Sequence, residues 1–196
     1  MKSICVFCGS SIGDDPVYAS ATGELARIIV SKGLTLVYGG GSIGLMGILA
    51  DKILSLNGKV TGVIPKFLYD LEVGHDGVSE LIIVESMHER KARMAEIADA
   101  FIALPGGFGT LEELSEIMTW VQLKLIEKPV GLLNINGYYD HFIRQLDHMV
   151  DESFLKVKNR KILHSSENPE VLVNMLIKAN EEIKKLPGDK DLHDLI

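Results

Sequence analysis

The chain has 196 residues, of which 46% are hydrophobic and 24% are charged, a composition typical of one compact domain that folds without disulfides or metals. Its net charge of -7 argues against a surface built to bind nucleic-acid phosphates. No apolar run reaches the ~18 residues that a membrane span needs, and the N-terminus lacks the pattern of a signal peptide, so we expect a cytoplasmic protein without membrane partners.

Short β-rich runs alternate with longer amphipathic segments in the first half of the chain. We expect strands at 3–8, 34–38 and 59–64. Helices are expected at 16–32, with Asp14 or Asp15 as the N-cap, and from the GGGSIGLMG turn to about residue 57. A polar loop at 70–77 then leads to a strand at 81–84.

The second half of the chain repeats this alternation. Ser86 is the expected N-cap of a helix to about residue 98, which precedes a strand at 100–104, the PGGFGT turn and a long helix at 110–127. A strand at 129–134, a helix at 139–152, a short strand at 161–164 and a closing helix at 169–185 follow. We therefore expect one domain at 1–186 and a frayed C-terminal tail at 187–196.

This order of elements predicts the architecture of the sheet. Strands separated by helices cannot pair through tight hairpins, so the sheet should be mainly parallel, with helices on both faces. The expected fold class is a doubly wound, Rossmann-like α/β domain, in which ligands bind beyond the carboxyl ends of the strands. Three glycine-rich turns fall at such ends, CGSSIG, YGGGSIGLMG and LPGGFGTLEE, and we expect them to converge on one crevice.

Cys5 and Cys8 form a CVFC pair that superficially matches a redox CxxC motif. The attacking thiol of a redox pair should open a helix, which lowers its pKa, whereas this pair lies within an apolar strand. Residues three apart on a strand face opposite sides, so we expect two separate core positions. No second CxxC completes a zinc site, and we expect no metal.

The second glycine-rich turn is a candidate phosphate site, because glycine amides at the start of a helix can approach an anion closely. The candidates are Gly39, Gly40, Gly41 and Gly44, with Ser10 from the first glycine-rich turn. A tight turn without a ligand is the alternative. The turn lacks the closing Gly-Lys-Ser/Thr of a Walker A loop, and no acidic residue ends the next strand as in a dinucleotide site.

The PGGFGT turn is more informative. Its proline stiffens the chain, its glycines let the backbone approach a ligand, and Thr110 offers a hydroxyl and an amide at the expected helix start. Glu112 and Glu113 follow in what we expect to be the first helical turn, where the helix dipole stabilises carboxylates. That stabilisation is by itself a sufficient structural reason for Glu112.

Basic residues precede this turn in the sequence MHERKARM, where Arg90, Lys91 and Arg93 lie on the expected helix before the strand. They should place fixed positive charge near the same crevice. A solvated helical face is the alternative for this group taken alone.

Three segments together, MHERK, PGGFGTLEE and KPVGLLNINGYYD, resemble the LONELY GUY family of phosphoribohydrolases, whose members have often been labelled lysine decarboxylases. The similarity runs from CVFCGSS to about the final helix. The resemblance implies hydrolysis of the N-glycosidic bond of an adenosine-type 5'-monophosphate, notably an N6-modified cytokinin nucleotide, to free base and ribose 5-phosphate. It implies no cofactor.

The resemblance also implies site residues. Arg90 and Glu113 correspond by matching motif to the family's catalytic pair. The residues that fall where the family contacts substrate are Glu72, in a loop that matches poorly, Lys91, Gly107, Phe108, Gly109, Thr110, Leu111, Glu112 and Thr119.

The chemistry fits these roles. Departure of the base leaves an oxocarbenium-like ribose, which the Glu113 carboxylate can stabilise while it orients or deprotonates water. Arg90 stays protonated, because an arginine guanidinium does not lose its proton in proteins, and it suits charge stabilisation or positioning of the phosphate or base. The group that protonates the leaving base is open; His88 is one candidate, with a structural or solvent-facing histidine as the alternative. His141 and His148 lack ligand spacing and are expected at the surface or in the core.

Other functions stay open at this stage. A nucleosidase for AMP or other purine monophosphates would share the machinery and differ around the base, whereas a nucleotide sensor or carrier would keep the pocket without chemistry. A pyridoxal-phosphate decarboxylase would need a Schiff-base lysine and an acidic partner, for which there is no convincing set. The apolar face formed by Met118, Trp120, Val121 and Leu125 suits core packing or a subunit interface. The resemblance implies that this helix lies near a dimer contact, so we expect at least a homodimer.

Overall fold

Seven parallel strands form one sheet in the computed structural model, which describes residues 1–185 except for the side chains of residues 72 and 73. The strand order is β4-β3-β2-β1-β5-β6-β7, and every neighbouring pair is parallel, as predicted. The strands are β1 (Ser3–Phe7), β2 (Thr35–Tyr38), β3 (Val60–Pro65), β4 (Glu80–Val84), β5 (Phe101–Ala103), β6 (Val130–Leu133) and β7 (Leu163–Ser166). The tail expected at 187–196 lies outside the described residues.

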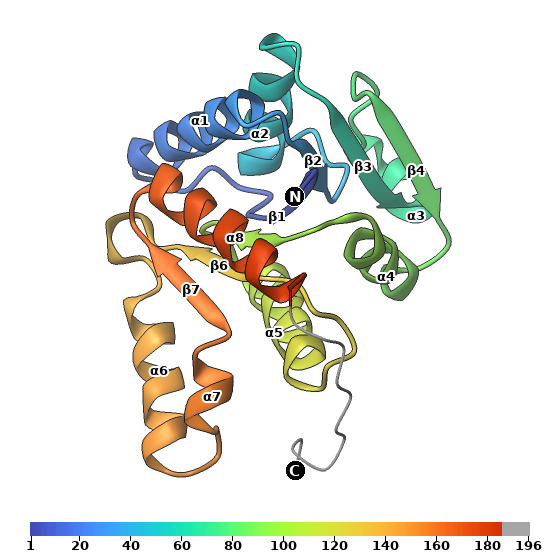
Figure 1. Cartoon of the computed structure of the whole chain (residues 1–196). Coiled ribbons are helices and arrows are strands. Elements are labelled where there is room, and N and C mark those ends of the chain that lie inside the picture. The colour runs from blue at the N-terminus through green and yellow to red at the C-terminus, as the bar shows by residue number, and fades with distance from the viewer. Residues whose placement is uncertain (186–196) are drawn as a thin grey trace.

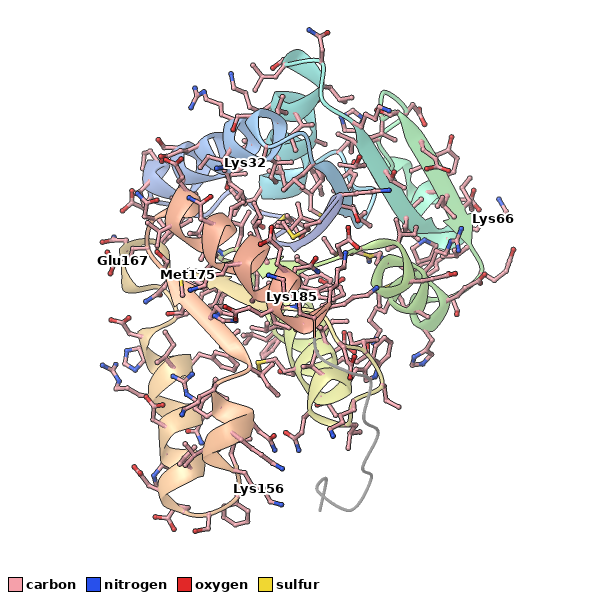
Figure 2. All side chains as sticks on the ribbon, in the orientation of Figure 1. Lys32, Lys66, Lys156, Glu167, Met175 and Lys185 are labelled. Carbon is pink, nitrogen blue, oxygen red and sulfur yellow. The ribbon has the colours of Figure 1, made fainter. Side chains whose placement is uncertain are left out.

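Helices cover both faces of this sheet (Figure 1), which confirms the doubly wound architecture. One face carries α1 (Pro16–Ser31), α2 (Gly44–Ser55) and α8 (Pro169–Ile183). The other carries α4 (Met87–Ile97), α5 (Phe108–Gln122) and α6 (Asp140–Asp151). The short helices α3 (Lys66–Leu68) and α7 (Val157–Arg160) lie near opposite edges of the sheet, and Lys66 and Lys156 mark their positions in Figure 2.

Alternation along β1 separates the two cysteines. Cys5 packs in the apolar cluster under α4 and α5, whereas Cys8 packs in the cluster under α1 and α2. Both are buried free thiols, and burial raises the pKa of each well above its usual value. The prediction of two separate core positions is confirmed.

Capping side chains fix where two of the predicted helices begin. Asp15 accepts a hydrogen bond from the Val17 amide at 2.9 Å and caps α1, so Asp15 rather than Asp14 is the cap. Ser86 accepts one from the Glu89 amide at 3.1 Å and caps α4, as predicted. The Glu89 carboxylate accepts in turn from the Glu85 amide at 2.9 Å, close to a capping box. Among the described residues, no helix is long and apolar enough to cross a membrane.

Several predicted boundaries were wrong. The helix expected at 110–127 begins earlier, at Phe108, and ends at Gln122, because Lys124 adopts a left-handed conformation with φ 53° that no helix can continue. Leu125 therefore lies beyond the helix and is 66% exposed, whereas Met118, Trp120 and Val121 pack against the core. The strand expected at 161–164 is shifted to Leu163–Ser166, and the predicted polar loop at 70–77 contains most of a π-helical turn, Tyr69–Val73.

The sheet reverses its winding between β1 and β5. From β1 the chain proceeds outward through β2, β3 and β4, and then returns to β5 on the other side of β1. The turns after β1 and β5 meet there, because the Gly9 amide donates a hydrogen bond to the Pro105 carbonyl at 3.0 Å. The Leu45 amide at the start of α2 donates to the Gly9 carbonyl at 3.1 Å. The carboxyl ends of these strands thus form one crevice at the topological switch point, where ligands bind in such sheets.

Candidate active site

A cleft of about 480 Å³ opens at this switch point. All three glycine-rich turns contribute to its wall, which confirms that they converge. Helices α4 and α5 provide its charged side chains. The lining residues are Cys8, Gly9, Ser10, Gly39, Gly41, Ile43, Met46, Ile64, Leu68, Met87, Arg90, Gly107, Phe108, Gly109, Thr110, Glu112 and Glu113.

Arg90 and Glu113 form an ion pair at the base of this cleft. The Nη2 atom of Arg90 lies 3.4 Å from Oε1 of Glu113, and each residue is only 8% exposed. Glu112 and Glu113 both stand in the second turn of α5, not in the first as predicted, because the helix begins at Phe108. The Nε atom of Arg90 is buried without a hydrogen-bond partner among the described residues, so its guanidinium retains a donor that nothing in the described chain satisfies.

Gly39 provides the space in which Arg90 lies. A Cβ atom added at Gly39 would come within 1.9 Å of Nη2 of Arg90 and within 2.9 Å of its Cζ. The position of the guanidinium therefore depends on the absence of a side chain at the end of β2. This is a packing reason for the first glycine of the GGG turn.

Burial dominates the electrostatics of Glu113. It raises the pKa of this carboxyl to about 7, with further upward contributions from Glu112 and Glu116 that Arg90 and Lys91 oppose. A carboxyl group with a pKa near neutrality exchanges protons readily at physiological pH. Such a carboxyl, inside a cleft and against a fixed guanidinium, is a candidate for acid–base chemistry.

The turn between β5 and α5 presents bare backbone to the cleft. A Cβ atom at Gly107 or Gly109 would meet nothing within 4 Å, and both residues line the cleft. The amides of the first helical turn have no partners within a helix, and the helix dipole makes this end positive. This end of α5 can therefore receive an anion, while Phe108, 94% exposed, stands at the rim.

The turn after β2 has other reasons for its glycines. Gly40 has φ 74°, and its carbonyl accepts a hydrogen bond from the His75 amide at 2.9 Å. Gly44 has φ 64°, and a Cβ atom there would meet the Ser10 backbone at 2.2 Å. Gly41 forms an isolated antiparallel bridge with Gly74. Tight packing accounts for these glycines, and a phosphate role for the turn stays a prediction.

Lys91 is placed differently from the other predicted substrate contacts. It lies outside the residues that line the cleft and is 7% exposed. Its Nζ atom forms ion pairs with Glu112 and, at 3.1 Å, with Glu116. Lys91 thus connects α4 to α5 next to Arg90 and Glu113 in the sequence, through ion pairs of its own.

The remaining predicted contacts do not meet in the cleft. Thr119 lies on an apolar hollow of about 270 Å³ between α5, α6 and α7, and its hydroxyl donates to the Ser115 carbonyl at 2.8 Å. Leu111 packs partly buried against the core. Glu72 belongs to the π-helical turn, and its side chain lies outside the described part of the chain. His88 is exposed and does not line the cleft.

Sequence reasoning missed the apolar wall of the cleft. Ile43 and Met46 at the start of α2, Ile64 in β3, Leu68 in α3 and Met87 in α4 line the cleft. In the sequence, nothing distinguishes these apolar residues from others that pack in the core. Their positions after β2, after β3 and at the start of α4, close to strand ends or helix starts, are the signal that could have found them.

Comparison with known proteins decides the family. The family model described as "Possible lysine decarboxylase" matches residues 46–176. A cytokinin riboside 5'-monophosphate phosphoribohydrolase of Arabidopsis thaliana is 49% identical over 175 residues, which cover 89% of this chain and 77% of that protein. The chain belongs to the LONELY GUY family.

A second LONELY GUY protein of the same enzyme name, from Oryza sativa subsp. japonica, is 50% identical over 88% of this chain and 71% of its own length. Solved structures show the same fold at lower identity. A molybdenum cofactor binding protein from Rippkaea orientalis superposes with a TM-score of 0.67 at 21% identity, covering 91% of this chain and 97% of that one. A Moco carrier protein from Chlamydomonas reinhardtii gives a TM-score of 0.67 at 20% identity over 92% of this chain and 98% of its own.

Proposed function

We propose that this protein is a phosphoribohydrolase that cleaves the N-glycosidic bond of N6-modified adenosine 5'-monophosphates, releasing the free cytokinin base and ribose 5-phosphate. The observation that carries the proposal is the buried Arg90–Glu113 pair at the base of a cleft whose rim is a helix N-terminus. The relatives at about half identity over most of the chain carry this enzyme name.

The 5'-phosphate binds at the N-terminus of α5 in this proposal. The bare backbone at Gly107 and Gly109 gives an anion close access to the amides of Phe108 and Thr110. Phosphate binding energy then holds the ribose over Glu113 and contributes to catalysis, which predicts a preference for nucleotides over nucleosides.

Glu113 acts on the ribose and on water. As the bond between C1' and the base nitrogen breaks, its electron pair leaves with the base and positive charge develops on the ribose. The ionised Glu113 carboxylate stabilises that charge and accepts the proton of the water that attacks C1'. The water oxygen forms the new bond to C1' of ribose 5-phosphate, and the proton that Glu113 accepts from the water balances the proton that the departing nitrogen takes up.

Arg90 holds this arrangement in place. Its guanidinium pairs with Glu113 and keeps an unsatisfied donor at Nε. Since it stays protonated, it serves as a fixed positive charge for the phosphate or for the leaving base. Gly39, Gly41 and Ser10 complete the wall around it, and Glu112 reaches the same cleft from α5.

We further propose a cytoplasmic homodimer that shares its sites. Thr119 is exposed on the hollow between α5, α6 and α7, away from the cleft of its own chain. It contacts substrate only if a second subunit brings its cleft to this face. Exposed apolar side chains also stand close in sequence to residues that line the hollow, since Phe154, 88% exposed, precedes Leu155, and Leu125, 66% exposed, follows Gln122 by three residues.

Mixed dimers test this arrangement. Thr119→Ala and Glu113→Gln subunits, each inactive in its own homodimer, should regain activity when mixed, because one site then receives both native residues. Sedimentation equilibrium supplies the assembly state. A monomer at micromolar concentration, or mixtures that stay inactive while exchanging subunits, would overturn the shared site.

Substrate comparison tests the reaction. Wild type and Glu113→Gln are incubated with AMP, isopentenyladenosine monophosphate and the matching nucleosides, and free base and ribose 5-phosphate are quantified by chromatography. Glu167→Gln, which removes an exposed carboxylate at the outer margin of the molecule (Figure 2), is the matched control.

We expect base release from nucleotides alone, with the isopentenyl nucleotide preferred, and its loss in Glu113→Gln but not in Glu167→Gln. A preference for AMP would instead assign general nucleotide cleavage. Binding of nucleotides without release of any base would refute the hydrolase and favour a carrier.

A further inference from the structure

Lys91 is buried between two carboxylates that flank the catalytic glutamate. Its Nζ atom, on α4, forms ion pairs with Glu112 and with Glu116, at 3.1 Å from the latter. These two residues stand one helical turn apart on α5, so one lysine spans both. Glu113 lies between them in the sequence and lines the cleft together with Glu112, whereas Glu116 does not line it.

Three carboxylates therefore share one end of α5. The groups that face Glu113 are Arg90 and Lys91 from α4, Glu112 and Glu116 from α5, and the neutral thiols of β1. Only the two cations offset the three acids. Arg90 is the direct partner of Glu113, which leaves Lys91 as the charge that balances the flanking pair.

We propose that Lys91 is a positioning residue, which holds Glu112 and Glu116 and keeps Glu113 ionised for the proposed hydrolysis, and that it makes no contact with the substrate. The inference rests on the proposed function. Lys91 does not line the cleft, and its side chain is buried with its Nζ atom paired to both Glu112 and Glu116.

Electrostatics supports this role. Burial disfavours the charged form of Lys91, but Glu112 and Glu116 outweigh burial and raise its pKa, so the lysine stays protonated. Its charge in turn lowers the pKa of Glu113, which burial and the two flanking carboxylates raise. Loss of the lysine would leave two uncompensated anions beside the catalytic carboxyl.

The pH dependence of kcat/KM measures this effect. In wild type the acid limb should fall near pH 7, the value about which Glu113 titrates. Lys91→Met should move the limb upward by about one pH unit. Lys91→Arg should return it to the wild-type position, and Glu116→Gln, which removes one flanking anion, should move it downward. Lys178→Met removes a lysine that faces Glu182 on the surface and is the matched control.

A carbon-13 NMR titration of the Glu113 carboxyl, without substrate, gives a second readout of the same shifts. The inference is overturned if neither the acid limb of kcat/KM nor the Glu113 titration moves in Lys91→Met. It is also overturned if KM rises while the acid limb stays in place. Lys91 would then be a structural or substrate-binding residue. If Lys91→Met does not fold, the downward shift of the acid limb expected in Glu116→Gln tests the inference by itself. Wild type that releases no base would refute the proposed function, and the NMR titration would still test Lys91.

Discussion

Replacing Glu113 by glutamine should make the protein more stable in alkaline solution. Burial raises the pKa of Glu113 from 4.5 to about 7, so the folded state binds its proton more tightly than the unfolded chain does. The stability that this proton supplies is complete below pH 4.5 and is lost as the pH rises through about 7. The glutamine side chain is neutral at every pH, so the Glu113→Gln variant keeps this stability as the pH rises.

The size of the effect follows from the difference between the two pKa values. Between pH 5 and pH 8, wild type should lose about 2.5 kcal/mol of unfolding free energy through Glu113 that the glutamine variant keeps. For a chain of this length, that corresponds to a relative gain in Tm of about 5 to 10 °C. Arg90 lowers the pKa of Glu113, so the value of about 7 already includes the contribution of the ion pair that Glu113→Gln removes.

Thermal unfolding of wild type, Glu113→Gln and Glu167→Gln at pH 5, 6, 7 and 8 tests this reasoning. The difference in Tm between Glu113→Gln and wild type should grow steadily with pH, whereas the exposed control should track wild type. A constant difference across this range would show that Glu113 does not titrate near neutrality, and the acid–base role argued above would lose its physical basis.

Three further substitutions probe the surroundings of the pair. Gly39→Ala should lower kcat/KM by about 10²-fold, because its Cβ atom would displace the Arg90 guanidinium; steady-state kinetics at the wild-type rate would contradict this packing argument. Gly23→Ala, whose Cβ atom meets nothing within 4 Å in α1, should keep full activity and raise the unfolding free energy by about 0.5–1 kcal/mol in urea titrations, and any loss of stability there would be unexpected. His75→Ala removes the 2.9 Å pair with Asp51 that fixes the segment beside the cleft, and should raise KM while costing about 1 kcal/mol of stability; unchanged KM and Tm would show that this pair does not hold the wall.

The fold was predictable because its signals are local and repeat along the chain. Apolar strands, capping residues such as Ser86, and glycine turns at strand ends together specify a parallel doubly wound sheet. Boundaries were predictable only where a cap or breaker stands in the sequence. Nothing marks Lys124 as left-handed, so the end of α5 was placed five residues too late.

The presence of Arg90 and Glu113 in the cleft was predictable, and the surroundings of this pair were less so. Arg90 and Glu113 stand in distinctive motifs, whereas the close packing of Gly39 against Arg90 joins segments 51 residues apart and has no local signal in the sequence. The same limit applies to Lys91, whose carboxylate partners lie on another helix. Long-range packing decides these roles, and no local pattern in the sequence encodes it.

The proposed catalytic pair lies on one continuous stretch of chain, since α4, β5 and α5 follow one another and carry both Arg90 and Glu113. Most of the apolar wall comes from earlier in the chain, from the start of α2 and from β3 and α3, and α4 adds Met87. The charged pair and most of the apolar lining are thus encoded in separate parts of the chain. Exchange of the segment around Leu68 between family members should therefore change the apolar lining of the cleft while leaving the Arg90–Glu113 pair intact.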